Sequence, residues 1–305
     1  MRPLVVLGPT ASGKSAVAMA IGRSRPDVEL VSVDSMQVYR GMDIGTAKPS
    51  AAEQVEVPHH LLDLAEPGED FSVGRFQEAV VAALATIEGR GHLPVLVGGT
   101  GLYLRAVIDE LHIPGQWPEV RVALDAEGDT VQLHRRLAEL DPVAATRMEP
   151  TNRRRVVRAL EVSLGSGRPF SSFGPGLEAY PATRFHLAGL RVSREVLARR
   201  IEERFDRMVE AGLVEEVRRL LRDHPAGLSR TARQALGYRE LLAHVEHRVP
   251  LAACIDHAVQ RTLRFARRQE AWFRRDPRIT WYDAADNPVA LAAVVLGDWE
   301  QQCRP

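Results

Sequence analysis

The chain has 305 residues, of which 45% are hydrophobic, and its formal net charge at pH 7 is zero. This composition predicts a folded protein with one large core or two modest ones, and no apolar run reaches the roughly 20 residues that span a bilayer. The two cysteines, Cys254 and Cys303, argue against a disulfide framework. We therefore expect a cytoplasmic protein without membrane contact. The zero net charge argues against nucleic-acid binding through bulk charge alone.

A short apolar strand at residues 4–7 leads into the sequence Gly-Pro-Thr-Ala-Ser-Gly-Lys-Ser at residues 8–15. This spacing is typical of a phosphate-binding loop, in which backbone N–H groups and a helix N-terminus surround an anion. Lys14 would then contact the phosphates, and the Ser15 hydroxyl would bind Mg²⁺. Lys14 and Lys48 are the only lysines in the chain, which indicates a need for a compact ammonium group at Lys14, whereas no such reason is visible for Lys48.

A second apolar strand, residues 29–33, ends at Asp34. Because the carboxyl ends of parallel strands line a common ligand crevice, Asp34 should face the same space as the glycine loop. It would bind Mg²⁺ or accept a proton there; the alternative is a turn or helix-capping residue. Residues 38–57 are predicted to be a long loop, and His59 and His60 begin an extended segment in which they would point to opposite faces, which argues against a shared metal.

A helix is predicted at residues 72–88 and a third buried strand at 94–97. This strand runs into Gly98-Gly99-Thr100-Gly101, where many nucleotide hydrolases with a phosphate-binding loop carry a Walker-B acid. The missing acid argues against an ordinary ATPase. The glycines indicate that a backbone or a flat substrate approaches this strand end closely.

The middle of the chain changes character between two segments rich in proline and glycine. Three short helices and a returning strand are predicted there, at residues 131–140, 142–148, 154–164 and 184–190. We therefore predict an α/β fold with a P-loop NTPase-like core, in which helices flank a parallel sheet, and an inserted small helical domain. The core would comprise residues 1–112 and 183–305, and the insertion residues 113–182.

The last third of the chain is predicted to be mostly helical. Helices are expected at residues 196–211, 214–221, 232–245, 251–275 and 289–302, with a late strand at 279–282. The helix at 251–275 interleaves Arg267, Arg268 and Gln269 with Trp272 and Phe273. Guanidinium groups beside large aromatics suit single-stranded or looped nucleic acid, and the simpler alternative is a solvated arginine face.

These stretches resemble the tRNA dimethylallyltransferase (isopentenyltransferase) family of the bacterial type, from Gly8 nearly to Tyr282. The resemblance is carried by residues 8–15, 34–49, 58–63, 98–103, 155–162 and 237–239. It implies Mg²⁺-dependent transfer of a dimethylallyl group from dimethylallyl diphosphate to N6 of the adenosine 3′ of the anticodon in tRNA. The implied partners are that diphosphate and the anticodon stem-loop of tRNA, and the implied enzyme is a monomer.

In this interpretation the glycine loop holds the departing diphosphate, Asp34 is the general base, and the adenine leaves its stack to react. The resemblance implies catalytic roles for Asp34, Thr10 and Arg204, and Mg²⁺ binding by Ser15. Diphosphate binding is implied for Gly8, Pro9, Thr10, Ala11, Ser12, Gly13, Lys14 and Ser15. Contacts to tRNA are implied for Asp34, Ser35, Met36, Gln37, Thr100, Arg121, Arg154, Arg155, Arg158, Gln234, Gly237, Tyr238, Arg239, Arg267, Arg268, Gln269, Trp272 and Arg274.

Three other functions remain open at this point. A small-molecule or nucleoside kinase would hold ATP in the loop and use Asp34 to deprotonate a hydroxyl. A prenyltransferase could instead modify a free adenine nucleotide, although the helical insertion and the arginine–aromatic helix would then have no task. The third is a non-catalytic, nucleotide-dependent RNA-binding protein.

Overall fold

The computed structural model describes residues 2–285 and 287–302, so that Cys303 lies outside the described residues. The chain forms two compact units, one comprising Met1–Ile108 and Ala182–Pro305 and the other Asp109–Pro181. The sequence predicts the insertion at residues 113–182. Among the described helices, none has the length and apolarity that a membrane span requires.

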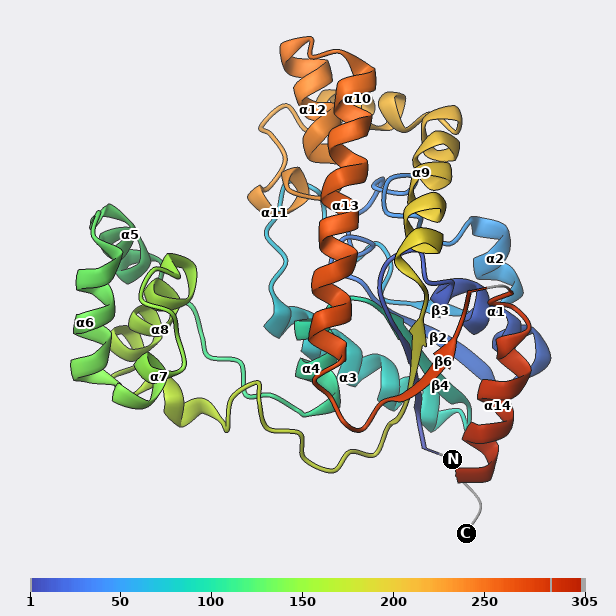
Figure 1. Cartoon of the computed structure of the whole chain (residues 1–305), viewed down its shortest axis with the longest axis horizontal. Coiled ribbons are helices and arrows are strands. Elements are labelled where there is room, and N and C mark those ends of the chain that lie inside the picture. The colour runs from blue at the N-terminus through green and yellow to red at the C-terminus, as the bar shows by residue number, and fades with distance from the viewer. Residues whose placement is uncertain (1, 286, 303–305) are drawn as a thin grey trace. The chain divides into compact units, whose positions relative to one another are not determined.

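The larger unit is built on a six-stranded sheet with the order β3-β2-β4-β1-β5-β6 (Figure 1). All neighbouring strands are parallel, which confirms the predicted α/β fold. The strands are β1 (Leu4–Leu7), β2 (Val28–Val33), β3 (His59–His60), β4 (Leu93–Gly98), β5 (His186–Arg191) and β6 (Thr280–Asp283). Because β1 lies between β4 and β5 with both faces covered, it consists only of Leu and Val.

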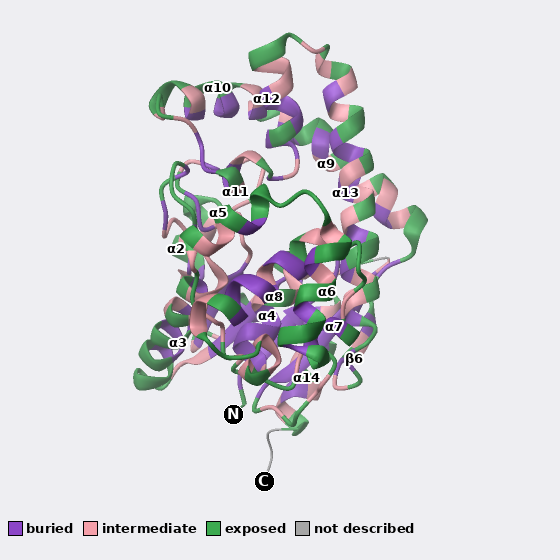
Figure 2. Ribbon diagram, turned by 90° about the vertical axis from the view of Figure 1, so that its left-hand side faces the viewer, coloured by how far each residue is buried: buried purple, intermediate pink, exposed green. Residues whose placement is uncertain are grey.

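Alternate residues of β1 enter two separate cores, as the two-residue period of a strand requires. Leu4 and Val6 pack into one core and Val5 and Leu7 into the other. The first core includes buried residues of α1 (Lys14–Ser24) and α14 (Leu291–Gln302). The second includes residues of α3 (Val73–Gly89), α4 (Gly101–Ile108), α9 (Arg194–Glu210), α10 (Leu213–Asp223), α11 (Arg230–Arg233), α12 (Tyr238–His247) and α13 (Leu251–Phe273), whose buried faces are purple in Figure 2.

Several predicted boundaries are wrong. Residues 232–245 do not form one helix, because α11 ends at Arg233 and Gly237, with a φ of 83°, precedes α12. The strand at His59 stops after two residues, since Leu61 has a left-handed φ of 66°. The loop at 38–57 contains α2 (Ala51–Glu56), whose start is marked by a capping box between Ser50 and Glu53. Helix α4 was not predicted from the sequence either.

The smaller unit is helical. It contains α5 (Pro118–Ala126), which the sequence analysis missed, α6 (Thr130–Leu140), α7 (Pro142–Thr146), α8 (Arg153–Ser166) and a 3₁₀ helix, η1 (Phe170–Phe173). Leu124, Leu133 and Leu160 are among the residues of its own hydrophobic core. Side chains cap three of its helices: Asp129 for α6, Asp141 for α7 and Asn152 for α8.

Candidate functional site

The glycine loop Gly8–Ser15 joins β1 to α1 at the carboxyl edge of the sheet. Gly8 has a φ of 151°, and a Cβ there would lie 2.7 Å from the carbonyl oxygen of Leu190. Gly13 is the N-cap of α1 with a φ of 94°, and no side chain in the described part of the chain caps this helix. The N–H groups of the first turn of α1 therefore remain available to an anion.

Two side chains of the loop carry polar groups suited to the same ligand. The Ser12 hydroxyl is fully buried and has no hydrogen-bond partner among the described residues. The Nζ of Lys14 donates to the Pro9 carbonyl oxygen at 2.8 Å, folding back over the loop. Burial lowers the pKa of Lys14 to about 8, an effect that the charge of Asp34 opposes and that of Arg204 reinforces. Ser15, by contrast, is exposed at the start of α1.

Asp34 directly follows β2 and forms a turn with its own backbone. Its Oδ1 accepts hydrogen bonds from the N–H groups of Met36 at 2.8 Å and Gln37 at 3.3 Å. This geometry matches the turn-forming alternative considered for the sequence. Its Oδ2 accepts no hydrogen bond from the described part of the chain, so turn formation leaves one carboxylate oxygen available.

Two arginines one turn apart on α9 reach the glycine loop. Arg204 donates from Nη1 to the Thr10 hydroxyl at 3.2 Å. Burial lowers the pKa of its guanidinium and the charge of Asp34 opposes this, but an arginine remains protonated at neutral pH. Arg200, which the sequence analysis missed, donates to Ala11 at 3.5 Å and to the carbonyl oxygens of Ala284 and Ala285 at 3.0 and 2.7 Å. The spacing of four residues from Arg204 was its only signal.

Three residues predicted to contact tRNA have side chains engaged inside the protein. Gln269 is 7% exposed and bonds to backbone groups of Thr10 and Gly99. The Gln37 amide accepts from the Ser32 hydroxyl and donates to two carbonyl oxygens of the following loop. Tyr238 is fully buried and its hydroxyl donates to Glu216. Gln269 and Tyr238 are buried and Gln37 is half-buried, and the polar groups of all three side chains are bonded within the protein.

The other predicted tRNA residues of the larger unit are mostly accessible. Arg268 stacks over the Phe265 ring at 5.7 Å from its centroid, and Arg274 pairs with Glu270 at 2.6 Å. Trp272 lies against Gly101, where a Cβ would come within 2.4 Å of its indole nitrogen. Exposed positions are Gln234, Arg239, Arg267, Arg268 and Arg274, half-buried ones are Ser35, Met36, Thr100 and Trp272, and Gly237 is buried.

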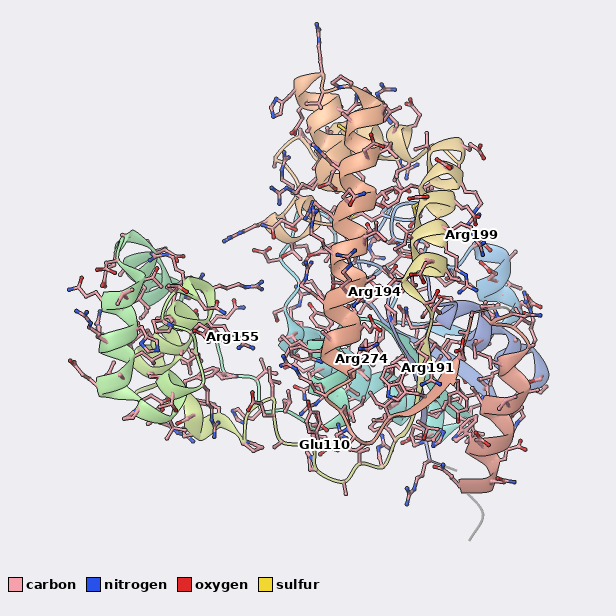
Figure 3. The ribbon with its side chains drawn as sticks, viewed as in Figure 1. Glu110, Arg155, Arg191, Arg194, Arg199 and Arg274 are labelled. Atoms are coloured by element: carbon pink, nitrogen blue, oxygen red, sulfur yellow. The ribbon has the colours of Figure 1, made fainter. Side chains whose placement is uncertain are left out.

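The predicted arginines of the smaller unit divide into two kinds. Arg154 and Arg155 are exposed, and their guanidinium groups make no ion pair or hydrogen bond with the described residues. Arg155 is labelled on α8 in Figure 3. Arg158 pairs with Glu161 at 2.8 Å and also bonds to two backbone carbonyls, and Arg121 pairs with Asp125 at 2.8 Å. Arg154 and Arg155 are thus available to a ligand, whereas Arg158 and Arg121 also hold their own unit together.

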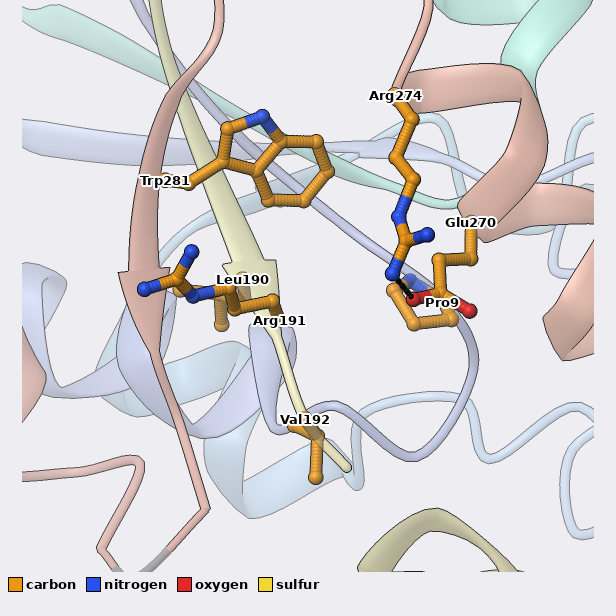
Figure 4. A pocket seen from close by; sticks show the side chains of 7 residues that line it. All are labelled: Pro9, Leu190, Arg191, Val192, Glu270, Arg274 and Trp281. Atoms are coloured by element: carbon orange, nitrogen blue, oxygen red, sulfur yellow. Dashed lines mark hydrogen bonds and ion pairs between the residues drawn. The ribbon is translucent and has the colours of Figure 1, made fainter. Parts of the chain in front are cut away.

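A cavity of about 280 Å³ lies beside the glycine loop (Figure 4). Its lining brings together an indole ring, two guanidinium groups and one carboxylate; the residues are Pro9, Leu190, Arg191, Val192, Glu270, Arg274 and Trp281. The Trp281 ring packs over Gly189, where a Cβ would approach it within 2.8 Å. Neither Arg191 nor Trp281 was predicted from the sequence. With Arg274 paired to Glu270, the cavity carries one net positive charge.

Comparison with known proteins agrees with this geometry. A family model described as IPP transferase matches residues 37–276. The chain is 44% identical to a tRNA dimethylallyltransferase of Desulforudis audaxviator, and the alignment covers 98% of both chains. It is similar to the crystal structure of the full-length tRNA isopentenylpyrophosphate transferase from Bacillus halodurans, with a TM-score of 0.69, 37% identity and coverage of 99% and 98%.

A second similar structure is that of a eukaryotic dimethylallyltransferase acting on tRNA. The TM-score is 0.83 at 25% identity, and the match covers 99% of this chain and 80% of that one. The family model matches most of the chain, and the relatives and solved structures match almost all of it. The chain belongs to the IPP transferase family.

Proposed function

We propose that this protein transfers a dimethylallyl group from dimethylallyl diphosphate to N6 of the adenosine 3′ of the anticodon in tRNA. The observation that carries this proposal is an anion-binding loop beside a carboxylate, with no acid at the end of β4. A Cβ on Gly98 would lie 2.3 Å from the carbonyl oxygen of Val33, which leaves no room for a Walker-B side chain. This favours diphosphate departure over nucleotide hydrolysis.

The diphosphate is proposed to bind in the glycine loop. The uncapped first turn of α1, the unpartnered Ser12 hydroxyl and the ammonium of Lys14 all suit an anion with several oxygens. Arg204 adds a second cation, already bonded to Thr10. These groups would stabilise the negative charge that grows on the leaving group as the allylic C–O bond breaks.

Mg²⁺ is proposed as the cofactor. The described residues contain no cluster of three His, Cys, Asp or Glu side chains that would hold a metal by themselves. A site with few protein ligands suits Mg²⁺, which commonly takes one or two protein oxygens and completes its shell with substrate phosphate oxygens and water. Ser15, at the start of α1, would supply the protein oxygen. Bound there, the ion would neutralise charge on the diphosphate.

The chemical step is a substitution at the allylic carbon. The N6 nitrogen forms a bond to that carbon while the C–O bond breaks, and diphosphate leaves with the electron pair. The nitrogen becomes acidic as it gains positive charge, and Oδ2 of Asp34 accepts its proton. Because an Asx turn fixes Oδ1, the orientation of the carboxylate is set before substrate binds.

Recognition of tRNA is proposed to combine the exposed arginines with an extruded adenine. Arg267 and Arg268 on α13 and Arg154 and Arg155 on α8 are placed at exposed positions suited to phosphate contacts. The reacting nitrogen lies on the Watson–Crick edge of adenine, so the base must leave its stack to reach the allylic carbon. Thr100 and Trp272, both half-buried beside the end of β4, are the proposed neighbours of this base.

Incubation with dimethylallyl diphosphate and unmodified tRNA tests the proposal. We expect a mass gain of one C5 unit on a single adenosine, located by digestion to nucleosides and mass spectrometry. A tRNA carrying guanosine at the same position is the control and should stay unmodified. Phosphate transfer from ATP, or its hydrolysis, without any prenylated nucleoside would contradict the proposal and favour a kinase.

A further inference from the structure

Gln269 lies on α13 at a point where three segments far apart in sequence meet. Its Oε1 accepts a hydrogen bond from the Thr10 N–H at 2.8 Å, and its Nε2 donates to the Gly99 carbonyl oxygen at 2.7 Å. The side chain is almost fully buried. One amide group therefore connects the glycine loop after β1 with the glycine turn after β4.

This contact leaves room only for glycine at position 99. A Cβ at Gly99 would lie 2.5 Å from Nε2 of Gln269 and 3.1 Å from the carbonyl oxygen of Gly8. Gly99 is not among the residues with positive φ, so its backbone conformation does not require glycine. Close packing against Gln269 and the loop is the physical reason for a glycine here.

Thr10 is held from two sides. Gln269 binds its backbone N–H, while Arg204 on α9 donates to its hydroxyl. The Thr10 N–H is therefore already used inside the protein. A bond at this position sets the path of the loop, and the path decides where the remaining N–H groups point.

We propose that Gln269 is a positioning residue, which fixes the glycine loop against the Gly99 turn so that the loop is preorganised for the diphosphate. The proposal rests on the proposed function of the loop. It assigns α13 two separate tasks: Arg267 and Arg268 face outward to nucleic acid, whereas Gln269 faces inward and serves the donor site.

Two replacements separate the bonds that Gln269 makes. Gln269→Met has similar length but makes neither bond, and Gln269→Glu keeps an acceptor for Thr10 while placing a carboxylate against the Gly99 carbonyl. Because the part-buried Thr10 N–H and the buried Gly99 carbonyl both lose their partner, we expect Gln269→Met to raise both the Kd and the KM for dimethylallyl diphosphate about tenfold or more. The Kd for tRNA should stay unchanged, and Gln269→Glu should also weaken donor binding, because its carboxylate faces the Gly99 carbonyl oxygen and adds negative charge beside the loop.

Arg267→Ala is the matched comparison, because it changes the neighbouring residue on the outward face. It should weaken tRNA binding and leave the Kd for dimethylallyl diphosphate unchanged. Donor affinity is measured by calorimetry without tRNA, so it requires no prenyl transfer. If the unaltered protein binds no diphosphate, the proposed function fails; if it binds and Gln269→Met binds equally well, or loses only tRNA affinity, this inference fails.

A double-mutant cycle with Gly99→Ala gives an independent test. The added methyl group should displace the Gln269 side chain and weaken donor binding. In a Gln269→Ala background the same methyl group meets no side chain, so its effect should become much smaller. Fully additive effects on the donor Kd would contradict the inference, and thermal unfolding of each variant verifies that it is folded.

Discussion

The affinity for dimethylallyl diphosphate should weaken as pH rises through about 8, because the Lys14 ammonium then loses its proton. Burial lowers the pKa of Lys14 from 10.5 to about 8 in the free protein. A bound diphosphate places negative charge beside the ammonium and raises the pKa of Lys14 again. Binding is therefore strongest below pH 8, where Lys14 is already protonated, and above pH 8 it requires uptake of one proton.

The size of the effect follows from the pKa. At pH 9 about a tenth of the free protein carries a protonated Lys14, so the apparent Kd should rise about tenfold between pH 7 and pH 9, equivalent to about 1.4 kcal/mol. A phosphate ester completes its ionisation near pH 6, and the ligand charge is therefore nearly constant in this range. Calorimetric titration without tRNA measures the Kd, and titration in buffers of different ionisation enthalpy measures the proton uptake.

Lys14→Arg provides the control. A guanidinium keeps its charge throughout this range but is planar and larger, so the variant should bind more weakly with a Kd that is independent of pH. A constant Kd for the unaltered protein from pH 7 to 9, or a parallel rise in Lys14→Arg, would refute the role given to this ammonium.

Three further changes test other parts of the site. Asp34→Asn retains the acceptor that forms the turn but cannot take a proton, so turnover should fall about 100-fold or more while the Kd for tRNA is unchanged; equal losses in both would make Asp34 a positioning residue. Arg268→Ala should weaken tRNA binding and reduce the slope of log K against log salt by about 0.9. Replacing the exposed Arg199 by alanine should change neither quantity. An unchanged slope for Arg268→Ala would mean that Arg268 contacts no phosphate of the tRNA. Glu216→Gln should lower the free energy of unfolding in urea by about 1–3 kcal/mol, because the buried carboxylate accepts from three backbone N–H groups and Tyr238; a loss below about 0.5 kcal/mol would contradict that role.

The parts of the site that could be predicted are those encoded locally. The strand, glycine loop and helix from Leu4 to Ser24 follow from hydrophobic pattern and glycine spacing, and both are read within a few residues. The position of Asp34 followed from one topological rule, since it ends a parallel strand in the same sheet. The absence of an acidic residue after β4 can also be read directly from the sequence.

The remaining parts depend on partners far away in sequence. Gln269 bonds to Thr10 across 259 positions, and Glu216 bonds to Asp43 across 173. No periodicity distinguishes an inward glutamine from the exposed Arg268 beside it, because only tertiary packing decides which helix face is covered. This is also why Tyr238, which the resemblance assigned to tRNA, lies in the core.

Lys48 shows how structure gives a reason that the sequence lacked. Its side chain is only 3% exposed, and Nζ donates to the Tyr39 carbonyl oxygen at 2.8 Å, Asp43 at 2.7 Å and Asp63 at 2.6 Å. Three acceptors around one point suit an ammonium, which has three donors, and do not suit a planar guanidinium.

Lys48→Arg should therefore lower the free energy of unfolding by about 1–3 kcal/mol, because the larger group overpacks an enclosed site. The control is Arg23→Lys at the exposed ion pair with Glu56, where the exchange should cost less than about 0.5 kcal/mol. Urea unfolding of both variants compares them directly. If the two exchanges cost the same, then enclosure does not explain why lysine stands at position 48. A larger cost at Lys48 than at Arg23 means that position 48 requires an enclosed ammonium, which an arginine cannot supply.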